Sequence, residues 1–274
     1  LGSQLSSGEE EASMNIRPLM VHCVAVAFAL PFTAAAVHAQ YKYPTKPIRL
    51  MTPFAPGGGS DILARLIGPQ VSESFGQPIV VDNRPGGAGT VGATLAVRAA
   101  PDGYTLILVS GSFGVSAALH KLSYDSVTDI TPIILIGTTG LLVAVHPTLP
   151  VKSTKDFIDY ARANPGKLNF GTAGLGDLGH LAGELFKLET KVNFTHVPYK
   201  GSGPVMTAIV SGEVQSSISS LVPAVPHVKA GRLRAIAVTT PKRSRALPDV
   251  PTIADTVPGY DVTHWYGIWG PKGL

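Results

Sequence analysis

The chain has 274 residues, of which 45% are hydrophobic and 15% charged, and its formal net charge is +4. The basic residues are scattered, and the one dense cluster, Lys242–Arg245, has no aromatic residues interleaved with it. That pattern argues against a nucleic-acid-binding protein, so no nucleic acid is expected among the partners.

The N-terminal part is typical of an export signal. Residues 1–13 are polar and fit no element, and we interpret them as an over-extended reading frame or a cloning remnant. The following 14–39 begin with a short basic region, continue through the apolar run Val21–Val37 and end in a small residue, Ala39. The sequence therefore predicts a signal peptide that is cleaved near Ala39. A single membrane anchor is the alternative, but Pro31 interrupts the run, which is shorter than the ~20 residues of a span.

Cleavage at this position changes the composition of the mature chain. It removes Cys23, the only cysteine, which excludes disulfides, thiolate metal sites and thiol nucleophiles from the exported protein. About 235 residues remain, enough for a large core. One basic and three acidic residues are lost, so the net charge rises to about +6, which favours anionic small molecules as ligands.

Strand-like apolar runs then alternate with helical patterns, as in α/β proteins with parallel strands. In the first part we predict strands at 48–53, 78–82 and 104–109, and helices at 60–74 and 90–99. In the second part we predict apolar runs at 132–137 and 141–145, helices at 154–163, 178–189 and 203–211, and strands at 167–171, 194–197, 214–219 and 233–239. Polar stretches near 121–130 and 221–231 are interpreted as crossings between two lobes.

Glycine-rich loops join several of these strands to the next helix. The first two are Pro56–Asp61 and Arg84–Thr90, and Gly171–Asp177 and Val197–Gly203 repeat the pattern. Glycine lets the backbone turn sharply and approach a ligand, and we expect a positive φ at Gly58. A helix start offers free N–H groups and the positive end of its dipole to an anion. The loops therefore predict a binding surface of backbone amides, glycine, serine and threonine, with few titratable groups.

Titratable residues near these loops leave alternatives open. Asp61 either caps its helix or contacts a ligand, and it can do both. His180 is interpreted as a packing or interlobe histidine rather than a catalytic base. With Asp177 and Glu184 it forms a mixed set with no closing partner, so no metal is predicted.

Serines in the ligand-type loops leave an enzymatic alternative open. Ser110, Ser112, Ser202 and Ser219 follow predicted strands, but none lies in a Gly-x-Ser-x-Gly sequence with a credible histidine and acid. An exported serine hydrolase therefore remains the second hypothesis. We expect a binding protein without a cofactor rather than an enzyme.

A series of motifs over roughly 41–274 resembles the Bug family, the extracytoplasmic solute receptors of tripartite tricarboxylate transporters. In order they are Tyr43–Arg49, Pro53–Arg65, Asn83–Gly89, Pro101–Thr105, His180–Glu184, Val197–Gly201, Lys242–Thr252 and Trp265–Gly267.

The resemblance implies an α/β, two-lobed periplasmic binding protein of the Venus flytrap type, with a ligand cleft between the lobes. It assigns 41–122 plus 231–274 to lobe 1 and 123–230 to lobe 2. The implied function is capture of a small carboxylate, by a monomer, for the membrane permease subunits of a tripartite transporter. A ligand-binding partner of a membrane sensor kinase would use the same pocket.

The resemblance also implies the ligand-binding residues. The first-lobe loop matches the family's main carboxylate-binding loop, and the facing loops add contacts. These residues are Phe54, Pro56, Gly57, Gly58, Ser60, Asp61, Ser110, Gly111, Ser112, Thr172, Ala173, Ser219 and Ser220.

The sequence also departs from the family pattern. Family members usually continue past the point that corresponds to Leu274, so we expect lobe 1 to be truncated and its closing helix absent, leaving apolar surface uncovered. Family sequences often carry Asp or Asn near Ser219 and Ser220, so the identity of the ligand stays open.

Overall fold

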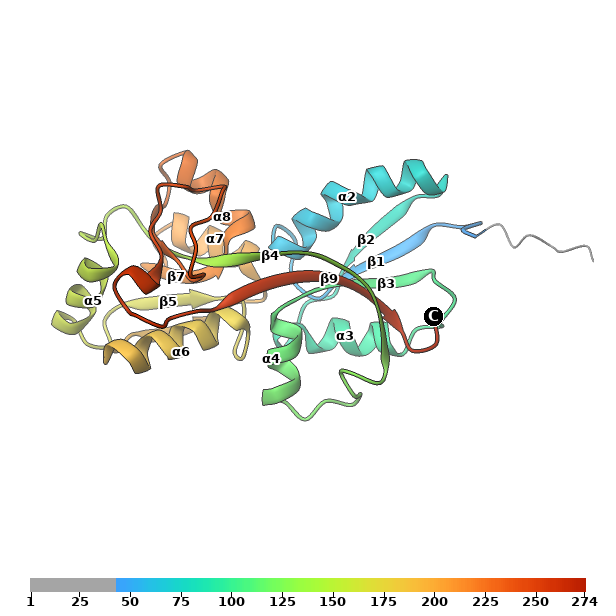
Figure 1. The fold of residues 1–274 in the computed structure, drawn as a ribbon, viewed down its shortest axis with the longest axis horizontal. Coiled ribbons are helices and arrows are strands. Elements are labelled where there is room, and N and C mark those ends of the chain that lie inside the picture. Colours follow the sequence, from blue (N-terminus) through green and yellow to red (C-terminus); the bar gives the residue numbers. More distant parts are fainter. Residues whose placement is uncertain (1–42) are drawn as a thin grey trace, which may run out of the picture. The chain divides into compact units, whose positions relative to one another are not determined.

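One long strand, β4 (Ile130–Val145), belongs to two β-sheets in this computed structural model, which describes residues 43–274 (Figure 1). The strand order is β2-β1-β3-β9-β4-β7-β5-β6, and β8 also pairs with β4. The predicted N-terminal extension, the signal peptide and Cys23 lie outside the described residues.

The first sheet combines three parallel strands with two antiparallel ones. Strands β2, β1 and β3 are parallel, β9 is antiparallel to β3, and the first part of β4 is antiparallel to β9. Its elements are β1 (Ile48–Thr52), α2 (Gly59–Phe75), β2 (Ile79–Asn83), η1 (Gly87–Gly89), α3 (Thr90–Val97), β3 (Thr105–Ser110), α4 (Ser112–Leu119) and β9 (Thr263–Pro271).

The second sheet repeats this arrangement. Strands β6, β5 and β7 are parallel, and β7 and β8 flank the second part of β4 in antiparallel pairs. Its elements are α5 (Thr154–Ala163), β5 (Asn169–Thr172), α6 (Leu178–Thr190), β6 (Thr195–Pro198), α7 (Ser202–Val210), β7 (Ser216–Ser220), α8 (Leu221–Lys229), β8 (Arg234–Val238) and η2 (Ile253–Asp255).

Helices cover both faces of each sheet, so the central strands are buried on both sides. β1 and β3 are mostly apolar, whereas β7 is buried although four of its five residues are serines. Successive strand residues point to opposite faces. Leu50 and Leu108 pack toward α2, whereas Met51 and Ile107 pack toward α3 and α4. In the second sheet α5 and α6 cover one face and α7 and α8 the other.

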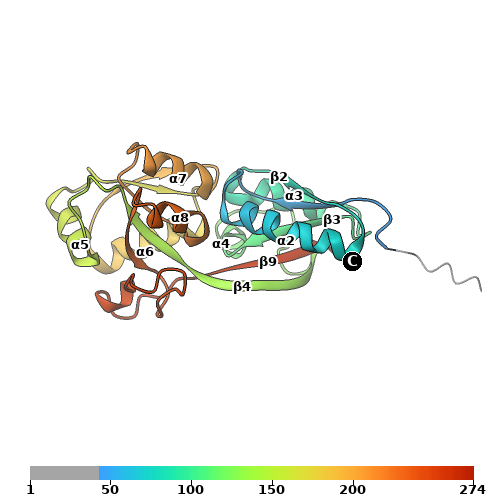
Figure 2. The same cartoon turned by 90° about the horizontal axis from the view of Figure 1, so that it is seen from above.

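Strand β4 changes partner part-way along its length. It pairs with β9 from Ile130 to Gly140, and with β7 and β8 from Leu141 to Val145 (Figures 1 and 2). The pairing with β9 shifts register between Pro132 and Ile134 and again between Leu135 and Gly137. Such bulges bend a strand and increase its twist, which lets one strand continue from one sheet into the next.

Most predicted elements agree with the structure, but the connections do not. The stretch 221–231 is not a crossing, because 221–229 forms α8. Its apolar residues recur at helical spacing, and Pro223 is tolerated because N–H groups in the first turn need no helical partner. The two runs 132–137 and 141–145 are one strand, and α4 and β9 were not predicted at all.

Strand pairing also departs from the predicted lobe boundaries. Residues 130–140 pair in the first sheet, although lobe 2 was predicted to begin at 123. Residues 234–238 pair in the second sheet, although 231–274 was assigned to lobe 1. The residues at which one lobe ends and the other begins stay a prediction. No helix among residues 43–274 is long and apolar enough to span a membrane.

The loop before β9 is held to the second sheet by hydrogen bonds between Val262 and Thr239 and by a buried one from Tyr260. The hydroxyl of Tyr260 donates to the Ala182 carbonyl at 2.7 Å. We expect Tyr260→Phe to lower the free energy of unfolding by about 1 kcal/mol, because the carbonyl loses its partner. Urea denaturation measures this change. Tyr160→Phe is the matched control, since no hydrogen bond of its hydroxyl is found among the described residues and its ring packs against the same core. Equal losses in the two variants would contradict the prediction.

Candidate functional site

Five helices begin at the wall of a small cavity between the two sheets. The cavity holds about 20 Å³, room for no more than about one water molecule. The wall residues at these helix starts are Gly59 and Ser60 of α2, Ser112 of α4, Asp177 of α6, Ser202 of α7 and Ser220 of α8. Phe54, Ser110, Leu141, Ala173, His264 and Tyr266 complete the wall.

This convergence directs the positive ends of five helix dipoles at the cavity. Each helix start carries about half a positive charge on its unpaired N–H groups. Neither lysine nor arginine lines the cavity. Backbone amides and hydroxyls are therefore the groups that would meet an anion.

The first-lobe loop is fixed by its own aspartate. Asp61 accepts hydrogen bonds from the Gly57 N–H at 2.9 Å and from Arg65 Nε at 3.0 Å. Burial alone raises the pKa of Asp61, but the hydrogen bonds from Arg65, Gly57 and Asn83 outweigh it and lower that pKa. The positive φ, +76°, lies at Gly57, whereas Gly58 is extended at −80°, so the prediction for Gly58 was wrong.

Serine hydroxyls hold the two sides of the cavity together. The Gly59 N–H of the first side donates to Ser202 Oγ of the second at 3.3 Å. In the reverse direction, the Leu178 N–H of α6 donates to Ser112 Oγ at 3.2 Å. Helix amides that an anion would use are thus occupied by serines from the facing side.

Two polar residues of β9 lie buried in the wall. Tyr266 shares a 2.6 Å hydrogen bond with Ser220, and burial raises its pKa to about 12. His264 is 4% exposed, its Nδ1 has no hydrogen-bond partner among residues 43–274, and burial lowers its pKa to about 4. At neutral pH the cavity therefore contains a neutral phenol and a neutral imidazole.

Asp177 is the acidic residue of the wall. Its carboxylate caps α6, accepting from the N–H groups of His180 at 3.0 Å and Gly179 at 3.2 Å. Burial raises its pKa to about 6, against the opposing effect of these backbone hydrogen bonds. The backbone hydrogen bonds favour the ionised form of this carboxyl.

The chain matches the model of the tripartite tricarboxylate transporter family receptor over residues 63–274. The chain belongs to this receptor family. It is 34% identical to protein BugT of Bordetella pertussis over 264 residues, 95% of this chain and 80% of BugT. Receptors of this family are periplasmic solute-binding proteins, and the two-lobed α/β fold agrees with that class.

Two solved structures of similar proteins contain carboxylates. The first is R. palustris Rpa4515 with adipate, 41% identical, with a TM-score of 0.81 over 84% of this chain and 78% of that chain. The second is MatC of Rhodopseudomonas palustris with bound malate, 35% identical, with a TM-score of 0.79 over 84% of this chain and 80% of that chain.

The receptor brings about half of the predicted site residues to the cavity. Those that line it are Phe54, Ser60, Ser110, Ser112, Ala173 and Ser220. Those that do not are Pro56, Gly57, Gly58, Asp61, Gly111, Thr172 and Ser219.

The residues that do not line the cavity have other surroundings. Thr172 Oγ1 lies 2.6 Å from His196 Nε2, and Asp61 is bonded within its own loop. Ser219 Oγ is buried with no hydrogen-bond partner in the structure. Pro56 and Gly57 line a separate groove.

Several wall residues were not among the predicted ligand-binding residues. His264 and Tyr266 lie on β9, which was not predicted. Gly59 and Ser202 lie in loops that were recognised, and Asp177 was considered only as a metal ligand. The predicted helix starts, taken together, would have indicated Gly59, Ser202 and Asp177.

Phe54 separates the cavity from a neighbouring hollow of about 280 Å³. That hollow is lined by the second glycine loop, Gly86–Ala88, and by Lys200, and it shares Phe54 and Ala173 with the cavity. A ligand larger than water therefore has adjacent space once the wall residues shift.

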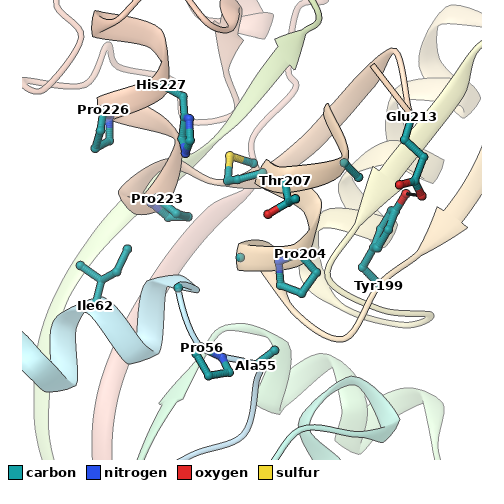
Figure 3. Close-up of a pocket in the computed structure, with 14 residues that line it drawn as sticks. Ala55, Pro56, Ile62, Tyr199, Pro204, Thr207, Glu213, Pro223, Pro226 and His227 are labelled. Atoms are coloured by element: carbon teal, nitrogen blue, oxygen red, sulfur yellow. Dashed lines mark hydrogen bonds between the residues drawn. The ribbon is translucent and has the colours of Figure 1, made fainter. Parts of the chain in front are cut away.

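An open groove of about 700 Å³ lies on the outer side of the first glycine loop (Figure 3). Pro56 and Ile62 line it from the first sheet's side, and Pro204 and Pro223 from α7 and α8. Glu213, an acidic residue that lines the groove, accepts a 2.6 Å hydrogen bond from the hydroxyl of Tyr199. The groove is mostly apolar and therefore a poorer place for an anion than the cavity.

Gly203 determines how closely α7 of the second sheet approaches the first glycine loop, and so how closely the two sides of the cavity lie. A Cβ at this position would lie 2.3 Å from the Pro56 carbonyl oxygen and 2.9 Å from Gly57 C. We expect Gly203→Ala to hold the sides apart and to increase the radius of gyration in small-angle scattering. Gly114→Ala in α4 is the control, because nothing lies within 4 Å of its Cβ. A Gly203→Ala profile equal to that of Gly114→Ala would contradict the prediction.

Proposed function

We propose that this receptor binds a small carboxylate in the cavity where the five helices begin. The observation that carries the proposal is the convergence of helix N–H groups on a space without basic side chains. The carboxylates found with Rpa4515 and MatC support the same ligand class.

The ligand carboxylate replaces the serine contacts across the cavity. In this structure Ser202 accepts from the Gly59 N–H, a donor that a carboxylate oxygen would use. Tyr266 and Ser220 lie next to this amide, because a Cβ on Gly59 would meet both hydroxyl oxygens within 2.6 Å. Phe54, Ser60, Ser110, Ser112 and Ala173 complete the proposed ligand contacts.

A few such contacts suffice energetically. Micromolar affinity corresponds to about −8 kcal/mol. Hydrogen bonds to a charged acceptor contribute about 1.5–3 kcal/mol each, so three or four account for most of the affinity.

The receptor acts as a monomer that delivers its ligand to the membrane permease subunits of a tripartite transporter. Sensing through a membrane kinase is the second role that this site supports, since it uses the same cavity. A hydrolase is less well supported, because no serine of the described wall hydrogen-bonds to a histidine, as an activated nucleophile requires.

Calorimetry with matched ligands tests the proposal. We expect adipate or malate to bind and the corresponding diamide to bind at least tenfold more weakly, because the helix dipoles favour negative charge. Gly59→Ala should abolish binding, since its Cβ would lie 2.0 Å from the Tyr266 hydroxyl. Gly114→Ala should bind as the wild type does. Equal affinity for acid and amide would overturn the proposal.

Export is the second element of the proposed function. We expect the mature N-terminus to follow Ala39, because a basic region, an apolar run and a small residue precede it. Mass spectrometry of the periplasmic fraction identifies this terminus. A membrane-bound product that retains Met14 would show that the segment is an anchor.

A further inference from the structure

The cavity wall is chemically uneven along its length. At one end Gly59, Ser202, Ser220 and Tyr266 lie together, joined by the Gly59–Ser202 and Ser220–Tyr266 hydrogen bonds. This end presents amides and hydroxyls and no acidic side chain. It is the end suited to a carboxylate.

The other end is formed by the starts of α4 and α6 together with His264 of β9, whose ring packs edge-on against Tyr266 of the first end with 4.8 Å between ring centroids. The Leu178 N–H donates to Ser112 Oγ, which joins the two helix starts. A Cβ on Gly111 would lie 3.0 Å from the Leu178 side chain and 3.1 Å from His264 Nδ1, so these residues are neighbours. Asp177 directly precedes Leu178 and lines the cavity.

Asp177 makes this second end unfavourable for another carboxylate. It is 5% exposed, and each of its oxygens accepts one backbone N–H bond. A carboxylate has about four acceptor positions. The Thr172 hydroxyl and the Ala173 N–H also approach the Asp177 carboxylate and lower its pKa, so a ligand donor would share it with them. A second carboxylate of a ligand at this end would be repelled by Asp177 at close range. Placing two like charges together discriminates strongly against a dicarboxylate.

His264 gives independent evidence that a polar ligand group reaches this end. It is nine-tenths buried in the cavity wall, and its Nδ1 has no partner. The great majority of buried polar atoms in proteins have a hydrogen-bond partner, and a buried polar atom without one lowers the stability of the fold. A polar ligand group beside His264 removes that cost.

We propose that the ligand is a small monocarboxylate with a hydrogen-bond donor, a hydroxyl or an ammonium group, at the end opposite its carboxylate. The carboxylate lies at the Gly59 end, and the donor meets Asp177 and His264. This inference rests on the proposed function and narrows it, because adipate and malate, found with the two relatives, are dicarboxylates.

Calorimetry with a matched ligand series tests the assignment. The series is butyrate, γ-hydroxybutyrate, γ-aminobutyrate and succinate, which differ only in the terminal group, and the same series at the hexanoate length ends in adipate. We expect the wild type to bind the hydroxy or amino acid at least about tenfold more tightly than the dicarboxylate of the same length.

Two substitutions assign the preference to residues. Asp177→Asn keeps an oxygen to cap α6 and removes the charge, so the dicarboxylate should gain about tenfold in affinity relative to the donor-bearing acid. His264→Phe removes the ring nitrogens, so the donor-bearing acids should lose affinity while butyrate or hexanoate does not. Asp156→Asn is the matched control, because Asp156 is an exposed acid in the first turn of α5 away from the cavity, and it should behave as wild type.

Each outcome bears on a different claim. A dicarboxylate that binds as tightly as the donor-bearing acid, or an unchanged ratio in Asp177→Asn, overturns this inference and leaves the carboxylate receptor standing. If no acid of either length binds the wild type, the proposed function itself fails. Should Asp177→Asn not fold in a thermal melt, the wild-type ratio and His264→Phe decide the question.

Discussion

The first turn of every α-helix leaves N–H groups without helical partners, and this receptor directs five such turns at one cavity. Those donors need acceptors when they are buried. In this structure the acceptors are partly serines from the opposite side, such as Ser202 for Gly59 and Ser112 for Leu178. The arrangement of both sheets follows from this, because their parallel strands must end at the same place for the helices to begin there.

A binding site built from backbone has consequences for specificity. The amides and dipoles recognise negative charge in general and do not depend on one side chain. Discrimination therefore falls to the few side chains of the wall that differ chemically from a hydroxyl. In this receptor those include Asp177, His264 and the aromatic ring of Phe54.

The sequence predicted the repeating parts of the fold better than their connections. The predicted helix 154–163 coincides with α5, because its apolar spacing and the capping Ser153 mark both its face and its start. By contrast, β9 contains two glycines and lies between β3 and β4, which are separated from it by more than a hundred residues. No local pattern records such a pairing.

The contrast between local sequence patterns and tertiary strand pairing also explains which of the wall residues could be predicted. Ser60, Ser112 and Ser220 line the cavity because each directly follows a strand or glycine loop and begins a helix, which the local sequence shows. His264 and Tyr266 reach the cavity only through the tertiary pairing of β9. Thr172 belongs to a recognised loop, but its hydroxyl turns to His196, a direction set by the neighbouring strand.

The position of β9 also constrains how the protein folds. The first sheet contains the strands nearest the N-terminus, yet its order places β9 between β3 and β4. During synthesis β1, β2 and β3 emerge early and cannot pair with β4 through β9 until residues 263–271 are available. The second sheet has all its strands by residue 238 and can form first. The half of the molecule that is made first is therefore completed last, and its open strand edge is exposed to wrong partners throughout that interval.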